Sequence, residues 1–198
     1  MIPGMTMHRK TSIINWKTAA ISLILLFCLQ PTSLAQEARL AHIIVTNTRD
    51  HLMVYLNVEG AFREEIKNAI SSGVPVSFSF LIELYENRNL WPDKKLAAKK
   101  ITHTVHYNNL KKEYSIKRSW DTGEPAVTKS FENAKALMTE IDGLKVVPLS
   151  NLEKDKRYQL RAKAELSKRT LPFYLHYVLF FVSLWDFETD WYAIDFTY

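Results

Sequence analysis

The nine residues VSFSFLIEL at positions 76–84 decide the fold. Every second position carries an apolar side chain: Val76, Phe78, Phe80, Ile82 and Leu84. Polar side chains stand between them at Ser77, Ser79 and Glu83. Because a β-strand turns successive side chains to opposite faces, this alternation predicts a strand with one face in the core and one in water.

The same period of two recurs along the chain. Tyr158, Leu160, Ala162, Ala164 and Leu166 alternate with polar residues. A polar break at 47–50 precedes alternating apolar residues, so residues 40–58 predict a hairpin. A second hairpin is predicted where the alternation from Ile101 to Tyr107 meets Asn108 and Asn109 and resumes at Tyr114 and Ile116.

Two segments change to helical spacing. Phe62, Ile66, Ala69 and Ile70 form one apolar stripe, which ends at Gly73. Phe131, Ala134, Leu137, Met138 and Ile141 form the other, which ends at Gly143. These elements predict a mainly β fold: an antiparallel β-sandwich, immunoglobulin-like in general shape, with two short amphipathic helices. The alternative is an α+β layer with both helices on one sheet face.

The first 35 residues have the composition of a bacterial secretory signal. Arg9, Lys10 and Lys17 precede an apolar run at 19–29, and Ser33-Leu34-Ala35 ends the segment with a small-x-small pattern. The run is about a dozen residues, whereas a membrane span needs about 20. We therefore expect residues 1–35 to be a removed signal peptide and residues 36–198 to be a single exported, periplasmic β-rich domain. An uncleaved anchor in the inner membrane is the alternative.

The expected domain is nearly neutral, but its charge is uneven. The chain has a formal charge of +5, and removing three bases with residues 1–35 leaves +2. Eight bases and one acid, Glu113, lie at 94–118. The bases are Lys94, Lys95, Lys99, Lys100, Lys111, Lys112, Lys117 and Arg118. They suit contact with an anionic surface such as lipid headgroups, although a lysine-rich hairpin can also serve solubility alone.

Several landmarks follow one another in a familiar order. They are Gly73-Val74-Pro75, Trp91-x-Asp93, Tyr107-x-x-Leu110, Tyr114, the segment 152–158, Leu171-Pro172, Trp185, Thr189 and Trp191. In this order and spacing, the chain resembles the bacterial envelope proteins of domain-of-unknown-function family 4390 over residues 38–195. The resemblance implies an exported protein of proteobacterial type and supplies no activity or catalytic residue.

Two groups of residues invite a metal-site interpretation. His103 and His106 stand three apart on a predicted strand, so their rings point to opposite faces and a hydrogen-bonded core histidine is favoured. Asp186, Glu188 and Asp190 share one face, but the spacing lacks the Gly and Glu that complete a calcium loop. A solvated acidic edge is the simpler interpretation.

The sequence therefore favours a non-enzymatic envelope module without cofactor or metal. We expect it to contact the membrane surface or a membrane protein partner, and we expect no nucleic acid partner. The apolar run at 171–185 is interpreted as a core element or, alternatively, as a membrane-docking patch. The alternative function is a small metal-dependent hydrolase that uses Asp186, Glu188 and Asp190. Oligomeric state is not predicted.

Overall fold

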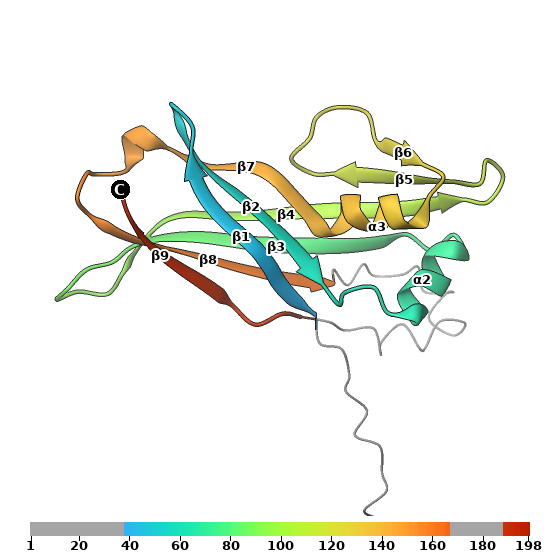
Figure 1. Ribbon diagram of the computed structural model, residues 1–198, viewed down its shortest axis with the longest axis horizontal. Helices are drawn as coiled ribbons and strands as arrows, with labels where there is room; N and C mark the ends of the chain where they lie inside the picture. The colour runs from blue at the N-terminus through green and yellow to red at the C-terminus, as the bar shows by residue number, and fades with distance from the viewer. Residues whose placement is uncertain (1–37, 167–187) are drawn as a thin grey trace, which may run out of the picture. The chain divides into compact units, whose positions relative to one another are not determined.

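The computed structural model describes residues 38–166 and 188–198, which belong to one compact unit, Gln36–Tyr198 (Figure 1). The strands are β1 (Arg39–Asn47), β2 (His51–Glu59), β3 (Val76–Glu86), β4 (Lys94–Asn108), β5 (Glu113–Arg118), β6 (Ala126–Thr128), β7 (Glu140–Pro148), β8 (Arg157–Leu166) and β9 (Tyr192–Thr197). The helices are α2 (Glu64–Ser71), α3 (Phe131–Thr139) and the 3-10 turn η1 (Leu149–Asn151).

The described strands form two antiparallel sheets. One sheet has the order β1-β2-β7 and the other the order β6-β5-β4-β3-β8-β9. With the two α-helices, this arrangement confirms the predicted mainly β, sandwich-like fold. The hairpin predicted at 40–58 is β1 and β2, and the second predicted hairpin is β4 and β5.

The alternating residues 76–84 lie in β3, a central strand of the larger sheet. Phe80, Ile82 and Leu84 on its core face are at most 1% exposed. Its other face departs from the prediction, because Ser77 and Ser79 are also buried. Their hydroxyls lie within hydrogen-bonding distance of two threonines of β4, at 2.8 and 3.3 Å, so the strand hides small polar groups that are satisfied by a neighbouring strand.

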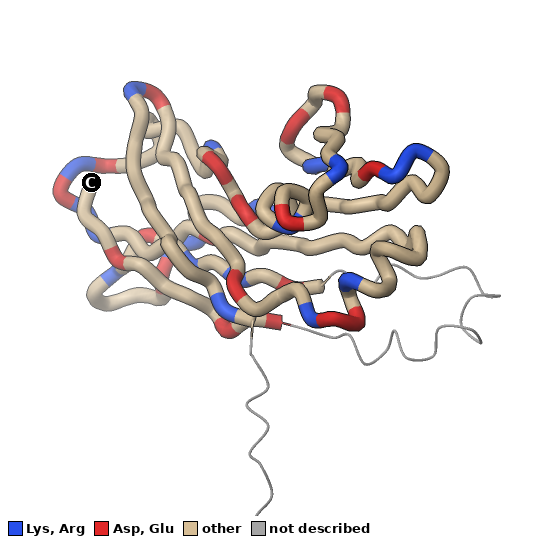
Figure 2. Tube along the Cα trace, turned by 45° about the vertical axis from the view of Figure 1, so that its right-hand side comes forward, with Lys and Arg blue, Asp and Glu red and all other residues tan. Residues whose placement is uncertain are grey.

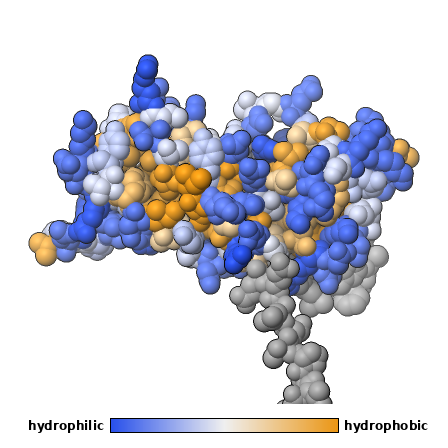
Figure 3. Space-filling model, viewed as in Figure 1, coloured by the Kyte–Doolittle hydropathy of each residue, from blue (hydrophilic) through white to orange (hydrophobic). Residues whose placement is uncertain are grey.

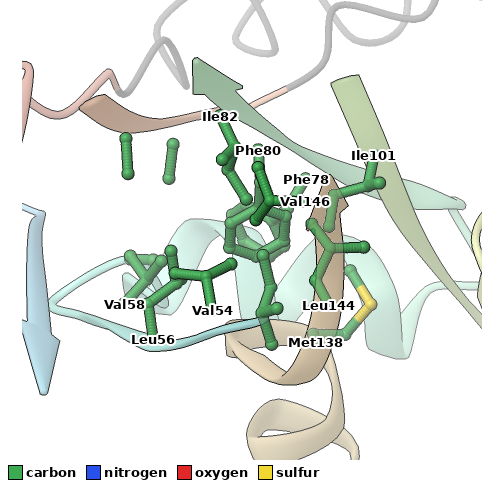
Figure 4. Packing of buried hydrophobic residues seen from close by; sticks show 14 of the residues in the cluster. Val54, Leu56, Val58, Phe78, Phe80, Ile82, Ile101, Met138, Leu144 and Val146 are labelled. Carbon is green, nitrogen blue, oxygen red and sulfur yellow. The ribbon is translucent and has the colours of Figure 1, made fainter. Parts of the chain in front are cut away.

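The two sheets share one hydrophobic core (Figure 4). The inward residues of β2 and β7 face those of β3: Val54, Leu56, Val58, Leu144 and Val146 against Phe78, Phe80 and Ile82. Burying one side chain of this size completely contributes about 1.5–3 kcal/mol to the free energy of folding. The alternation of apolar residues thus supplies the main stabilising interaction between the sheets.

Both helices pack on the face of the larger sheet that carries this core. The ring of Phe62, just before α2, lies 5.1 Å from the ring of Phe78, and the first residue of α3, Phe131, lies 5.9 Å from the ring of Tyr114. Met138 of α3 is fully buried. The smaller sheet and the helices therefore cover the same face of the larger sheet, which joins features of both predicted architectures.

The helix predicted to continue through Ile141 to Gly143 ends at Thr139 instead. The Thr139 hydroxyl donates to the carbonyl of Lys135 at 3.1 Å, and Glu140 is already extended, with φ −103° and ψ 135°. Ile141 is 1% exposed because it is a core residue of β7. The apolar spacing could not separate the last helical position from the first strand position.

Strand β4 is longer than the sequence predicts. Alternation suggested a start at Ile101, but β4 begins at Lys94 and has 15 residues. At about 3.3 Å per residue it is about 50 Å long. A bulge near its start, where the register with β3 shifts, interrupted the alternating pattern and hid this extension. The loop at 87–93 and the turn at 109–112 consequently lie at opposite ends of one strand (Figure 1).

Candidate functional site

Strand geometry separates the eight bases at 94–118. Register with β3 and β5 puts three on the outer face of the larger sheet: Lys95, Lys100 and Lys117. It puts three on the side of the core: Lys94, Lys99 and Arg118. Lys111 and Lys112 lie in the β4–β5 turn. The structure therefore brings the eight bases together on no single surface.

Two of the bases on the outer face make contacts within the domain. Lys95 pairs with Glu83 at 2.7 Å, and Lys100 pairs with Glu165 at 2.8 Å. The hydrogen bond from Lys95, and then that from Tyr85, holds the pKa of Glu83 below its usual value. The first ion pair joins the neighbouring strands β4 and β3, and the second reaches from β4 across β3 to β8 on the same outer face, so these charges are largely balanced inside the fold.

The loop at 87–93 projects two apolar side chains from one end of β4. Leu90 is 92% exposed and Trp91 is 74% exposed. In Figure 3 a small apolar (orange) group marks the lower left extremity, where Figure 1 places the loop between β3 and β4, and the surface beside it is hydrophilic (blue). Exposed neighbours of this size are unfavourable in water, which makes the pair a candidate contact.

Polar contacts hold this loop in shape. The Arg88 N–H donates to Asp93 Oδ1 at 3.3 Å, closing the loop on itself. The Asn87 N–H donates to the carbonyl of Arg157 at 2.9 Å, and Arg157 Nη2 donates to Asn89 Oδ1 at 3.1 Å. The loop is therefore anchored to β8 while its apolar residues stay in solvent.

The β4–β5 turn at the other end is built in a similar way. Asn108 Oδ1 accepts hydrogen bonds from the backbone N–H groups of Leu110, at 3.0 Å, and Lys111, at 3.1 Å. Leu110 is 95% exposed, and the two lysines after it colour the turn blue in Figure 2. An exposed leucine thus marks each end of β4.

Uncompensated charge also lies toward the ends. Among the residues that the structure describes, five of the eight bases have no carboxylate oxygen within 4.0 Å, namely Lys94, Lys99, Lys112, Lys117 and Arg118, and Lys111 is 3.8 Å from Glu113. Lys94 directly follows the apolar loop and Lys112 lies in the turn, whereas Lys117 lies on β5 opposite Thr104, away from the turn. Each tip therefore has a lysine without a carboxylate partner beside its exposed leucine.

His103 is a core histidine, as predicted. It is fully buried, and its Nε2 must accept the 3.1 Å hydrogen bond from Trp120 because an indole N–H can only donate. Nδ1 then carries the proton and donates to the carbonyl of Met138 at 3.2 Å. Burial, the largest cause, lowers the pKa of His103 to about 4. Both nitrogens are occupied, and His106 lies exposed on the opposite face.

The acidic cluster is only partly visible, because Asp186 and the apolar run at 171–185 lie outside the described residues. Glu188 forms an ion pair with Lys163, and Asp190 is exposed. Between them, the buried Thr189 hydroxyl accepts the Ala164 N–H at 3.0 Å. Within residues 38–166 and 188–198, no three His, Cys, Asp or Glu side chains form a group that could hold a metal ion.

A family model described as Domain of unknown function (DUF4390) matches residues 35–195. The chain belongs to the DUF4390 family. No curated protein and no solved structure matches the sequence. In the described part of this DUF4390 chain, no helix is long and apolar enough to cross a membrane.

Several landmarks of the DUF4390 resemblance have a place in the packing. The rings of Tyr107 and Tyr114 are in tilted contact with centroids 4.6 Å apart, and the buried Tyr158 hydroxyl accepts the Glu153 N–H at 2.7 Å. Trp91 and Leu110 belong to the same set of landmarks, but they are not part of the hydrophobic core that the described residues form.

Sequence reasoning did not select Leu90, Trp91 and Leu110 as site residues in this DUF4390 chain. A signal was present, because each stands among asparagines in a segment between two strands. Turn segments normally carry polar residues, so a leucine or tryptophan there breaks the pattern and points to a contact.

Proposed function

We propose that this protein is a non-catalytic binding module of the cell envelope that docks on an anionic membrane surface through Leu90 and Trp91. The observation that carries the proposal is the exposure of this pair, 92% and 74%, on a loop held by hydrogen bonds. The export signal expected at residues 1–35 supports a place outside the cytoplasm, with an uncleaved inner-membrane anchor as the alternative.

The energetics favour docking by this loop. Burying a leucine side chain contributes about 1.5–3 kcal/mol, and tryptophan prefers the membrane interface, where its ring is apolar and its N–H stays wet. Because Asp93 and Arg157 already fix the loop, little conformational entropy is lost on binding. The loop is therefore preorganised in its binding conformation before it contacts a membrane.

A lipid surface fits this loop better than a protein surface does. The loop is convex, and a protein partner would need a pocket matched to both side chains, whereas lipid can close around them. Lys94 stands at the start of β4 without a carboxylate within 4.0 Å among the described residues. Its charge attracts anionic headgroups within a screening length of about 10 Å at 0.1 M salt.

The test is flotation of the full chain with vesicles of phosphatidylcholine containing one-third phosphatidylglycerol. Leu90→Ser combined with Trp91→Ser is expected to weaken binding about tenfold or more. Val127→Ser removes an exposed apolar residue on β6, 58% exposed, and serves as the matched control. Every variant keeps residues 1–35, so any binding by that segment is common to all.

Charge dependence gives a second arm. Lys94→Glu is expected to weaken binding severalfold, with a smaller effect at high salt because the attraction is screened. If the double serine variant binds within twofold of the control, the loop is not the docking element. If the double serine variant still floats with the vesicles but no longer binds a protein that the wild-type chain binds, the partner of the loop is a protein and not lipid.

A further inference from the structure

We propose that the domain bridges two anionic lipid surfaces, with the β4–β5 turn as its second docking point. The inference rests on the proposed function of Leu90 and Trp91. It adds that Leu110, Lys111 and Lys112 contact a second membrane at the same time. The two docking points are the two ends of one long strand.

The two tips lie far apart and extend in opposite directions. The loop at 87–93 precedes β4 and the turn at 109–112 follows it, so the two tips are separated by the 15 residues of that strand. This separation is about 50 Å. Figures 1 and 3 both show the loop and the turn at opposite ends. Tips that extend in opposite directions along one strand are placed to contact two surfaces when the strand stands perpendicular to both.

Hydrogen bonds hold the β4–β5 turn in one conformation. Asn108 binds the turn twice through its side chain, and its carbonyl accepts the Lys112 N–H at 2.8 Å. Lys112 has φ +55°, a left-handed conformation that costs free energy for any residue with a side chain. Under the turn, the rings of Tyr107 and Tyr114 pack against each other in a tilted contact. These contacts keep Leu110 in solvent, so its 95% exposure does not come from a loose tail.

The turn also carries positive charge. Lys111 and Lys112 stand at this end against one acid, Glu113, which is 3.8 Å from Lys111. A single leucine with neighbouring lysines is too small for a stable protein interface, which buries about 800 Å² per partner. It does suit a deformable anionic surface, which surrounds the tip and needs no matching pocket.

The test uses the full chain and vesicles that contain one-third phosphatidylglycerol, half labelled with a donor dye and half with an acceptor. Wild-type protein is expected to cluster the vesicles, which raises light scattering and energy transfer without lipid mixing. Leu110→Ser combined with Lys112→Gly is expected to lower clustering about fivefold or more while flotation stays within twofold of wild type. Glycine accepts φ +55°, so this variant retains the turn.

The outcomes separate the two proposals. If wild-type protein binds vesicles but never clusters them, or if the turn variant clusters them as well as wild type, the bridge is wrong and the role of Trp91 stands. Clustering caused by a protein dimer or by residues 1–35 would survive the turn variant and give that second result. If the Leu90→Ser, Trp91→Ser protein floats like wild type, the proposed function itself fails.

Discussion

The ammonium group of Lys99 donates a hydrogen bond of 2.7 Å to the backbone carbonyl of Lys145. Lys99 lies on β4 of the larger sheet and Lys145 on β7, an edge strand of the smaller one. An edge strand exposes carbonyls that could pair with another chain, and this bond covers one of them. A base that the sequence assigned to a binding surface thus ties the two sheets together.

Lys99→Met is therefore expected to lower the free energy of unfolding by about 1 kcal/mol, since it removes a charged hydrogen bond at a partly solvated position. Urea unfolding followed by circular dichroism measures the change. Lys94→Met, at the start of the same strand, is the matched control and should change stability by less than about 0.5 kcal/mol. Equal effects of the two variants would contradict a structural role for Lys99.

Stability should depend on the charge of His103. Its pKa is lowered to about 4 in the fold, below the ordinary value of 6.5, so the unfolded chain takes up the proton first as pH falls. The stabilisation that comes from keeping His103 neutral is complete above pH 6.5 and is lost as pH falls from 6.5 toward 4. We expect the free energy of unfolding to fall by about 2 kcal/mol between pH 7 and pH 5. Urea unfolding at several pH values measures it.

His103→Gln isolates this effect. Glutamine has no charge to gain, so the variant should be less stable at pH 7 but should have a flatter stability profile between pH 7 and pH 5. That range lies above the lowered pKa values of Glu83 and Glu86, whose hydrogen bonds from lysines are lost only at lower pH. An unchanged slope in the variant would assign the pH dependence to another group.

Gly143 on β7 is expected to resist substitution. Its φ is +75°, and an added Cβ would lie 3.4 Å from Met53 Cε and from the Tyr55 hydroxyl. Gly143→Ala should cost about 1–2 kcal/mol of stability from the left-handed conformation alone. Gly123→Ala is the control, since an added Cβ there meets mainly the Asp121 side chain. Thermal unfolding of both variants decides whether the position needs glycine.

The sequence predicted the elements whose periodicity was uninterrupted. Alternation from Val76 to Leu84 and from Tyr158 to Leu166 became β3 and β8, because each strand has one face in a shared core. Periodicity failed where two elements meet. Thr139 ends α3 by bonding to its own helix, and Ile141 fits the apolar stripe of either element. Side-chain spacing contains no information on such a local hydrogen bond.

The candidate site was less predictable than the fold. The charge run at 94–118 was correctly found, but its partners are set by register. Glu83, 12 residues before Lys95, and Glu165, 65 residues after Lys100, balance these two lysines. The exposed tips could have been found from Leu90 and Leu110 in their polar surroundings, whereas their distance from each other required the length of β4.

The most direct test of the account is the depth of Trp91 in a membrane. Protein labelled with 5-fluorotryptophan gives one fluorine resonance per tryptophan, and Trp91→Phe assigns the signal. With anionic vesicles that carry a spin-labelled lipid, the Trp91 resonance should broaden strongly, while that of Trp120, hydrogen-bonded to His103, should broaden little. A Trp91 signal that broadens no more than the Trp120 signal, under conditions in which the protein floats with the vesicles, would contradict docking through this loop.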